Sequence, residues 1–174
     1  LLVGGPGLGK SQLARVIGHE MATDFTEVLG QSIASPADLN ALLLGATEKS
    51  VVHIDEAHEL DKSFQTALYL ALDKRQIFLQ SRARGPQSIP IADFTLLLST
   101  TDEYCLLQPM RDRMKLLLRF EFYTVEELST LLRHRASALR WSVEEAVFPL
   151  IAARSRGTPR LALRLLQSCR RVCR

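Results

Sequence analysis

Short apolar runs alternate with longer amphipathic segments through the first two thirds of the chain. The apolar runs are typical of buried strands, and they lie at residues 1–4, 26–29, 51–54, 94–98 and 116–122. Helices are predicted between them at residues 10–21, from Ser35 onward and at residues 61–72, where Asp61 is the N-cap. This alternation predicts an α/β fold, a parallel sheet flanked by crossover helices.

Two further β-type runs, Ile77–Leu79 and Ile89–Ile91, interrupt the alternation. The segment between them, residues 80–88, is polar and basic and contains Gly85-Pro86. Two short strands joined by turn-forming residues predict a β-hairpin inserted into the α/β domain.

The pattern becomes wholly helical after Tyr123. Thr124 and Glu127 have the spacing of a capping box, and apolar residues then recur at helical spacing up to Leu139. Two more helices are predicted, over residues 144–153 and from Pro159, the latter with Leu161, Leu165, Cys169 and Val172 on its apolar side. We therefore predict two domains, an α/β domain at residues 1–122 and a small all-helical domain at residues 123–174.

Composition is that of an ordinary globular domain, with 47% apolar and 24% charged residues among 174. No apolar run approaches the ~20 residues that a membrane helix needs. The chain opens on an apolar strand without Met or a basic segment, so we expect no signal peptide and a first strand that lacks its beginning.

Charge is unevenly distributed along the chain. Residues 1–123 carry a net charge of −3, whereas residues 124–174 contain ten Arg and four Glu, a net charge of +6. A basic C-terminal part fits an anionic partner such as nucleotide phosphate or nucleic acid, although charge alone favours a solvated helix face.

The three cysteines, Cys105, Cys169 and Cys173, are too few for a disulfide framework. Cys169 and Cys173 could offer two metal ligands from one helix face, but no second ligand pair accompanies them. Small buried hydrophobic residues are therefore the favoured interpretation of the cysteines, and a reducing cytoplasm is the simplest compartment.

Residues 4–11 match the phosphate-binding pattern G-x-x-x-x-G-K-[ST] between a strand and a helix. Glycines let backbone N–H groups wrap phosphates, Lys10 can reach the β- and γ-phosphates, and the Ser11 hydroxyl can bind Mg²⁺. A glycine-rich turn without ligand is the weaker alternative. The predicted nucleotide contacts are Gly5, Pro6, Gly7, Leu8, Gly9, Lys10 and Ser11.

A second acidic motif ends the apolar strand at residues 51–54. Asp55 can hold the Mg²⁺ shell, and Glu56 can polarise an attacking water. An acidic strand-to-helix turn would be the plain alternative, and a core position explains His53 better than catalysis. Thr100-Thr101 end another strand, where hydroxyls can bind phosphate or water, or simply form a turn.

Six segments resemble motifs of the RuvB family of AAA+ ATPases, in the same order and over nearly the whole chain. They are Gly-Pro-Gly-Leu-Gly-Lys-Ser (5–11), Ile-Asp-Glu-Ala-His (54–58), Phe-Thr-Leu-Leu-Leu-Ser-Thr-Thr (94–101), Arg-Asp-Arg (111–113), Phe-Tyr-Thr-Val-Glu-Glu-Leu (122–128) and Arg-Gly-Thr-Pro-Arg (156–160).

The resemblance implies roles for residues whose chemistry is otherwise ambiguous. Thr101 falls at the first sensor position, Arg113 matches the arginine finger that serves a neighbouring subunit, and Arg160 matches the second sensor in the lid domain. Extra guanidinium groups stabilise charge on a transferring phosphoryl group. Without the resemblance, these arginines and Arg111 would be interpreted as surface charge.

Family membership would also imply a fold and partners. The fold is an AAA+ P-loop NTPase with a hairpin insertion and a helical lid, which binds ATP and Mg²⁺ and forms a hexameric ring on duplex or junction DNA. In this family the hairpin docks on the protein RuvA, and a segment before the phosphate loop and a C-terminal winged helix complete the chain.

Several positions depart from the family pattern. Asp102 replaces an arginine after the sensor threonines, Met114-Lys115 replace Phe-Gly, and the hairpin at residues 76–91 is shorter with a polar, basic tip. Two functions are therefore considered: an ATP-driven Holliday-junction branch-migration motor in recombination and repair, and a RuvB-derived switch that remodels a protein partner without translocating DNA.

Overall fold

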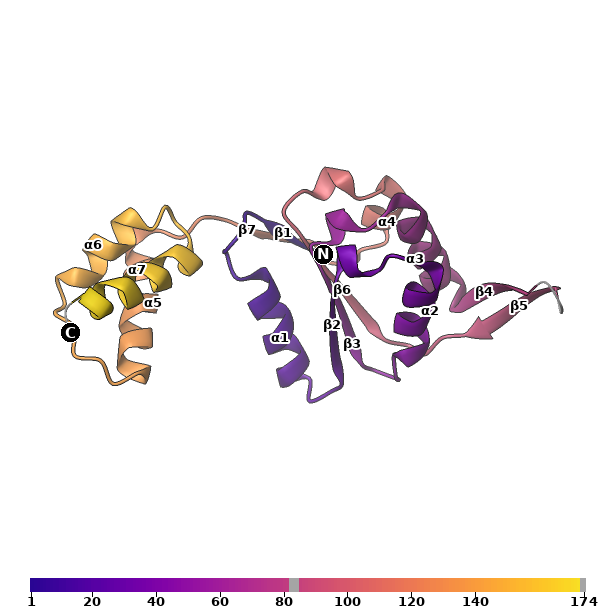
Figure 1. The fold of residues 1–174 in the computed structure, drawn as a ribbon, viewed down its shortest axis with the longest axis horizontal. Coiled ribbons are helices and arrows are strands. Elements are labelled where there is room, and N and C mark those ends of the chain that lie inside the picture. Colours follow the sequence, from indigo (N-terminus) through magenta and orange to yellow (C-terminus); the bar gives the residue numbers. More distant parts are fainter. Residues whose placement is uncertain (82–84, 173–174) are drawn as a thin grey trace. The chain divides into compact units, whose positions relative to one another are not determined.

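The computed structural model describes residues 1–81 and 85–172, which form two compact units (Figure 1). The first contains Leu1–Val3 and Ser11–Arg119, and the second contains Gly4–Lys10 together with the chain from Phe120. In the described part of the chain, no helix combines the length and apolarity needed to cross a membrane.

A five-stranded sheet with the order β2-β3-β6-β1-β7 is the centre of the first unit. Its strands are β1 (Leu2–Gly4), β2 (Phe25–Leu29), β3 (Val51–Asp55), β6 (Thr95–Thr100) and β7 (Leu118–Phe120). The pairs β2–β3, β3–β6 and β1–β6 are parallel. Residues 51–54 are fully buried, as expected of a central strand covered on both faces. The predicted parallel sheet is confirmed, with β7 shorter than residues 116–122.

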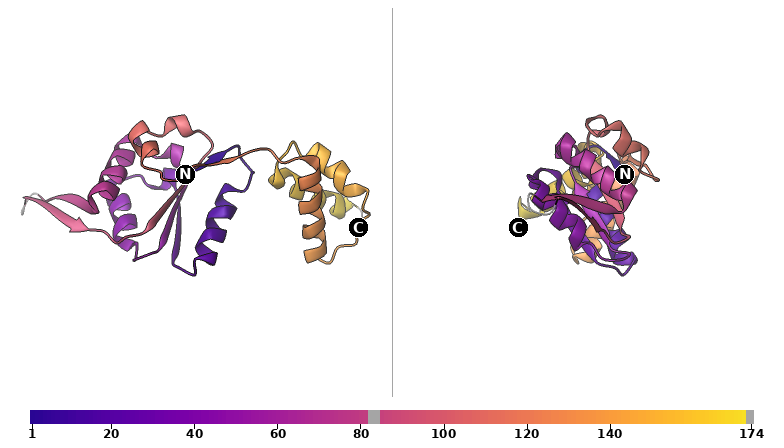
Figure 2. Two further views of the ribbon diagram at one scale, coloured as in Figure 1. Left: turned by 180° about the vertical axis from the view of Figure 1, so that it is seen from behind. Right: turned by 90° about the vertical axis from the view of Figure 1, so that its right-hand side faces the viewer.

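Helices cover both faces of this sheet. Figures 1 and 2 show α1 (Lys10–Glu20) on one face and α2 (Pro36–Gly45) and α3 (Lys62–Lys74) on the other. Ser35 and Asp61 cap α2 and α3 by accepting hydrogen bonds from Asp38 N and Ser63 N. The sequence did not predict the short helix α4 (Gln108–Asp112), whose Met110 is buried in the core.

The inserted hairpin consists of β4 (Gln76–Ser81) and β5 (Gly85–Pro90), paired antiparallel. Both strands run further toward the tip than the two apolar runs predicted, because backbone pairing continues where apolar side chains end. Residues 82–84 of the predicted polar turn lie outside the described residues.

Three helices form the remainder of the second unit: α5 (Val125–Ala138), α6 (Val147–Arg154) and α7 (Pro159–Val172). Thr124 and Glu127 make the predicted capping box at the start of α5. Helix α6 begins later than residue 144, which places Pro149 in its first turn, where the missing N–H costs no helical hydrogen bond. The core includes Leu128, Leu132, Ala136, Phe148, Ile151, Ala152, Ala162 and Leu166.

Two predictions about buried residues were wrong. Helix α7 buries Ala162 and Leu166, whereas Val172 is 87% exposed and Cys169 is also exposed. The small side chain of Ala162 faces the core. The buried face of α7 is therefore rotated about the helix axis relative to the face that its leucines predicted. Cys105 is exposed as well, and Cys173 lies outside the described residues.

Candidate nucleotide site

The glycine-rich loop has the backbone that its sequence predicts. Gly7 and Gly9 have φ angles of +80° and +105°, a region that residues with a Cβ rarely adopt. Lys10 is almost buried, and its Nζ donates hydrogen bonds to the carbonyl oxygens of Gly4 at 2.7 Å and Gly5 at 3.0 Å. The loop therefore surrounds the Lys10 ammonium group, which could bind a phosphate there.

The start of α7 contacts this loop inside the second unit. Arg160 N donates to Gly7 O at 3.3 Å, and a Cβ added to Gly7 would lie 3.0 Å from Arg160 Cβ. The Tyr123 hydroxyl donates to Leu8 O at 3.4 Å. Gly7 is therefore needed both for its φ angle and for the close approach of Arg160.

The first unit brings together the two predicted metal ligands. Ser11, in the first turn of α1, donates its hydroxyl to Asp55 Oδ2 at 2.7 Å, and Asp55 ends β3. Burial acts to raise the pKa of Asp55, but hydrogen bonds from Ser99, Ser11 and the Glu56 N–H outweigh it, so this pKa lies below its usual value. An ionised carboxylate beside a hydroxyl is a pair of hard oxygen donors that suits Mg²⁺.

The described residues contain no group of three or more His, Cys, Asp or Glu side chains that could hold a metal. Magnesium at a nucleotide does not need one, because phosphate and water oxygens supply most of its ligands. Ser11 and Asp55 therefore fit a magnesium–nucleotide complex better than a metal held by protein alone.

Glu56 follows Asp55 in a left-handed backbone conformation, with φ 50° and ψ 50°. Its Oε2 atom is buried without a hydrogen-bond partner and lies 3.5 Å from His58 Nδ1. The turn is fixed by Gly30, because a Cβ there would lie 2.6 Å from Glu56 O. A carboxylate oxygen that makes no hydrogen bond within the protein can accept one from a water molecule.

The two threonines after β6 differ in environment. Thr100 is buried, and its Oγ1 lies 3.1 Å from His58 Nδ1 and donates to Asp102 O at 2.9 Å. Thr101 is exposed. Successive residues of an extended chain point in opposite directions, so Thr100 supports the turn while Thr101 remains available to a ligand.

Arg113 follows α4 and is held by α3. Its Nε donates to both carboxylate oxygens of Asp73 at 2.8 Å, and its guanidinium lies 4.6 Å from the centre of the Tyr69 ring. These hydrogen bonds raise the pKa of Arg113 above its ordinary value. Among the described residues, no side-chain hydrogen bond or ion pair joins Arg113 or Thr101 to Asp55 or Glu56.

Sequence reasoning missed four contributors: Gly30, His58, Ser99 and the contacts of His53. Ser99 donates to Asp55 Oδ1, and His53 Nε2 lies 2.9 Å from Ser99 Oγ. The sequence offered a signal for Ser99 alone, because this residue lies directly before Thr100-Thr101 at the end of an apolar strand.

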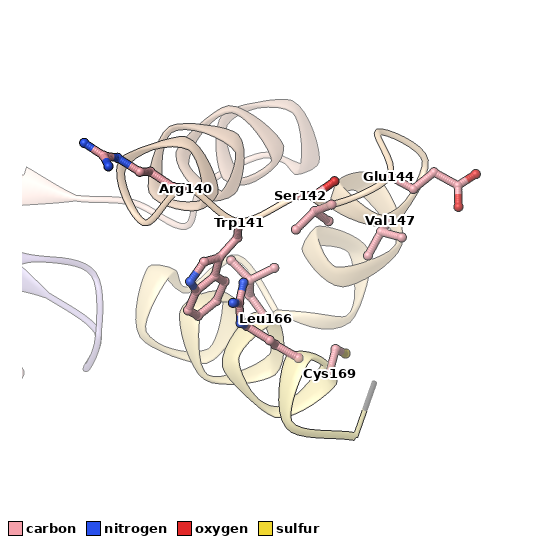
Figure 3. A pocket seen from close by; sticks show the side chains of 9 residues that line it. Arg140, Trp141, Ser142, Glu144, Val147, Leu166 and Cys169 are labelled. Atoms are coloured by element: carbon pink, nitrogen blue, oxygen red, sulfur yellow. The ribbon is translucent and has the colours of Figure 1, made fainter. Parts of the chain in front are cut away.

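The second unit also contains a cavity of about 430 Å³ beside Trp141 (Figure 3). Val143, Val147 and Leu166 give it apolar walls, and the guanidinium of Arg170 lies 4.2 Å from the centre of the Trp141 ring. None of the predicted site residues lines it.

Comparison with known proteins identifies relatives over nearly the whole chain. Residues 1–120 match the family model "Holliday junction DNA helicase RuvB P-loop domain", and residues 123–173 match "RuvB AAA lid domain". The chain is 38% identical over 173 residues to the Holliday junction branch migration complex subunit RuvB of Koribacter versatilis, covering 98% of this chain and 48% of the relative. It is 38% identical over 174 residues to RuvB of Thermotoga maritima, covering 98% and 52%.

Solved structures agree with the sequence matches. A mutant of Thermotoga maritima RuvB has a TM-score of 0.87 and 36% identity, covering 95% of this chain and 53% of the other. The structure described as the Thermotoga maritima RuvB Holliday junction branch migration motor has a TM-score of 0.84 and 36% identity, covering 95% and 52%. This chain therefore spans about half the length of the relatives it matches. Because both family models match along the chain and its site has the loop and acidic strand end that the motifs predict, this chain belongs to the RuvB family.

Proposed function

We propose that this chain is the ATPase part of a motor that drives Holliday-junction branch migration. Residues 1–122 would be the AAA+ core and residues 123–174 the helical lid. The observation that carries the proposal is the 2.7 Å hydrogen bond from Ser11 to Asp55, two residues 44 positions apart. This contact unites the end of the phosphate loop with a strand-end carboxylate, which is the arrangement of Mg²⁺ ligands in P-loop NTPases.

The chemistry assigned to each residue follows from its environment. Residues 5–9 wrap the phosphates, Lys10 neutralises the β- and γ-phosphates, and Ser11 and Asp55 hold Mg²⁺. The Mg²⁺ that Ser11 and Asp55 would hold would supply positive charge to offset charge developing on the phosphates. Glu56 orients and deprotonates the attacking water.

Two more residues would report on the γ-phosphate. Thr101 is exposed beside the strand end, and Arg160 enters α7 against the loop. Because the Arg160 N–H bonds Gly7 O, a change in the loop on nucleotide binding is transmitted directly to α7.

Assembly and partners extend the proposal. We propose a homo-hexameric ring in which Arg113 acts in trans on the neighbouring subunit's ATP, and duplex or junction DNA as the substrate. The side chain of Arg113 is one-third exposed, so a neighbouring subunit can reach it. Phe78 of β4 is 55% exposed and offers an apolar contact for a RuvA-like partner at the hairpin.

Mg²⁺-dependent ATP binding is the first test. In Lys10→Ala, ATP affinity should fall strongly because a point charge at the β- and γ-phosphates is lost. The matched control Lys74→Ala removes an exposed lysine of α3 and should bind ATP normally. Equal affinity of the wild type and Lys10→Ala in a fluorescence titration would overturn the proposed nucleotide site.

The full-length protein on a synthetic four-way junction tests the motor. ATP-dependent branch migration, in the presence of a RuvA-type partner, should occur in the wild type and not in Glu56→Gln. ATP hydrolysis without branch migration would instead favour a RuvB-derived switch that remodels a protein partner.

A further inference from the structure

A series of polar side-chain contacts crosses strands β2, β3 and β6 and ends at Asp55. Arg15 donates to Glu27 Oε2 at 2.8 Å, and Glu27 Oε1 lies 3.3 Å from His53 Nδ1. On the other edge of the ring, His53 Nε2 lies 2.9 Å from Ser99 Oγ, which donates to Asp55 Oδ1. The strand register explains the contact between Glu27 and His53, because these two residues pair across β2 and β3, as Leu29 and Asp55 do.

Counting donors assigns one proton in this series of contacts. The Ser99 hydroxyl has one proton and donates it to Oδ1 of Asp55. The Ser99 oxygen is then an acceptor, so His53 must donate from Nε2. The other ring nitrogen, Nδ1, lies 3.3 Å from Glu27 Oε1.

His53 is completely buried, and its two ring nitrogens lie against Glu27 and Ser99. An imidazole in this position loses hydration that a leucine would not lose, so space filling alone does not account for it.

We propose that His53 is a positioning residue of the nucleotide site. Its Nε2–H holds the Ser99 hydroxyl as a donor to Oδ1 of Asp55, which leaves Oδ2 directed at Ser11 and at the metal that these two residues would share. The proposal rests on the proposed function, since Asp55 matters here as a ligand of magnesium.

The first experiment uses the full-length protein without nucleotide, so that it stands independently of the proposed function. ¹⁵N NMR of the His53 ring should show a proton on Nε2. In Ser99→Ala the occupancy of that proton should fall, because its acceptor is gone. A ring protonated at Nδ1 alone, or an Nε2 proton unaffected by Ser99→Ala, would overturn the positioning role.

The second experiment measures how Mg²⁺ changes the affinity for a fluorescent ATP analogue. In His53→Leu the Mg²⁺ concentration needed for half-maximal effect should rise roughly 10- to 100-fold, the usual cost of losing a residue that orients a metal ligand. Affinity without Mg²⁺ should stay unchanged. His53→Gln, whose amide can still donate, should recover part of the loss and keeps the test informative if His53→Leu folds poorly.

A double-mutant cycle separates this mechanism from general destabilisation. If His53 acts through Ser99, the variant with both His53→Leu and Ser99→Ala should need no more Mg²⁺ than Ser99→Ala alone. Independent, additive effects would overturn the proposal. A wild type without any Mg²⁺ effect on nucleotide affinity would instead count against the proposed function, and the NMR result would still decide the role of His53.

Discussion

At the scale of single residues, the end of β3 and the turn after it contain the two carboxylates of the proposed site, Asp55 and Glu56. Glu56 adopts a left-handed conformation that costs a residue with a side chain on the order of 1–3 kcal/mol. The fixed contacts around it hold this conformation: the Glu56 N–H donates to Asp55 Oδ1 at 3.0 Å, and Gly30 leaves room for the Glu56 carbonyl. The surrounding structure thus holds the Glu56 backbone in this conformation before any ligand binds.

Glu56→Gln should bind ATP with wild-type affinity and hydrolyse it about 10²- to 10⁴-fold more slowly, because an amide keeps the shape but cannot accept a proton. Steady-state phosphate release checks the rate, and a binding titration checks the affinity. The matched control Glu59→Gln makes the same change at an exposed carboxylate nearby and should hydrolyse ATP normally. Near-normal turnover of Glu56→Gln would show that another group activates the water.

At the scale of elements, the three helices of the second unit depend on a small core. Leu128 and Leu132 of α5 are fully buried, and Phe148 of α6 and Leu166 of α7 pack with them. Most helical stability comes from such packing of an apolar face rather than from helix propensity. A single large cavity in this core should therefore affect the whole helical unit.

Leu132→Ala should destabilise the helical unit by about 2–5 kcal/mol, the range for leucine deletions in cores. The control Leu150→Ala removes a leucine of α6 that is 57% exposed and should change stability little. Trp141 is the only tryptophan of the chain and packs against this core, so its fluorescence during urea unfolding reports on this unit. Equal unfolding midpoints for both variants would show that Leu132 does not support the unit.

At the scale of the whole molecule, the position of Arg113 concerns assembly. The residue is bound to Asp73 and stacked on Tyr69 within its own subunit. Action on a neighbouring nucleotide would require this guanidinium to exchange Asp73 for phosphate, a stronger anionic partner. The pair with Asp73 holds the arginine at the surface in a defined orientation.

Arg113→Ala in the full-length protein should bind ATP normally yet lose most hydrolysis, because arginine fingers acting in trans contribute roughly 10³- to 10⁵-fold. Mixing Arg113→Ala with Lys10→Ala subunits tests the shared site. Each variant alone should be inactive, whereas in an equal mixture about one seam in four joins an intact Lys10 to an intact Arg113. Partial recovery of ATPase activity on mixing is the expected result.

The control mixes Lys10→Ala with Lys10→Ala,Arg113→Ala subunits, which contain no intact site and should stay inactive. If Arg113→Ala alone kept full activity under conditions where a ring is shown to form, the assignment of the finger would be wrong. Arg111, which lies over the Tyr104 ring, would be the next residue to test.

The sequence by itself determined the elements and the local motifs. Capping by Ser35, Asp61 and Thr124, the conformations of the phosphate loop, and the strand that ends at Asp55 depend on neighbours within a few residues. Such interactions are encoded by spacing, which is why the α/β sheet, the hairpin and the helical unit could all be predicted.

Tertiary structure alone decided the contacts between distant residues. No spacing predicts that Ser99 and His53 meet at Asp55, or that Arg113 binds Asp73. Strand order and register bring these side chains together, and both result from packing the whole sheet. The exposed positions of Cys169 and Val172 on α7 were mispredicted for the same reason, since the partners of a helix, and not its own apolar pattern alone, select the face that is buried.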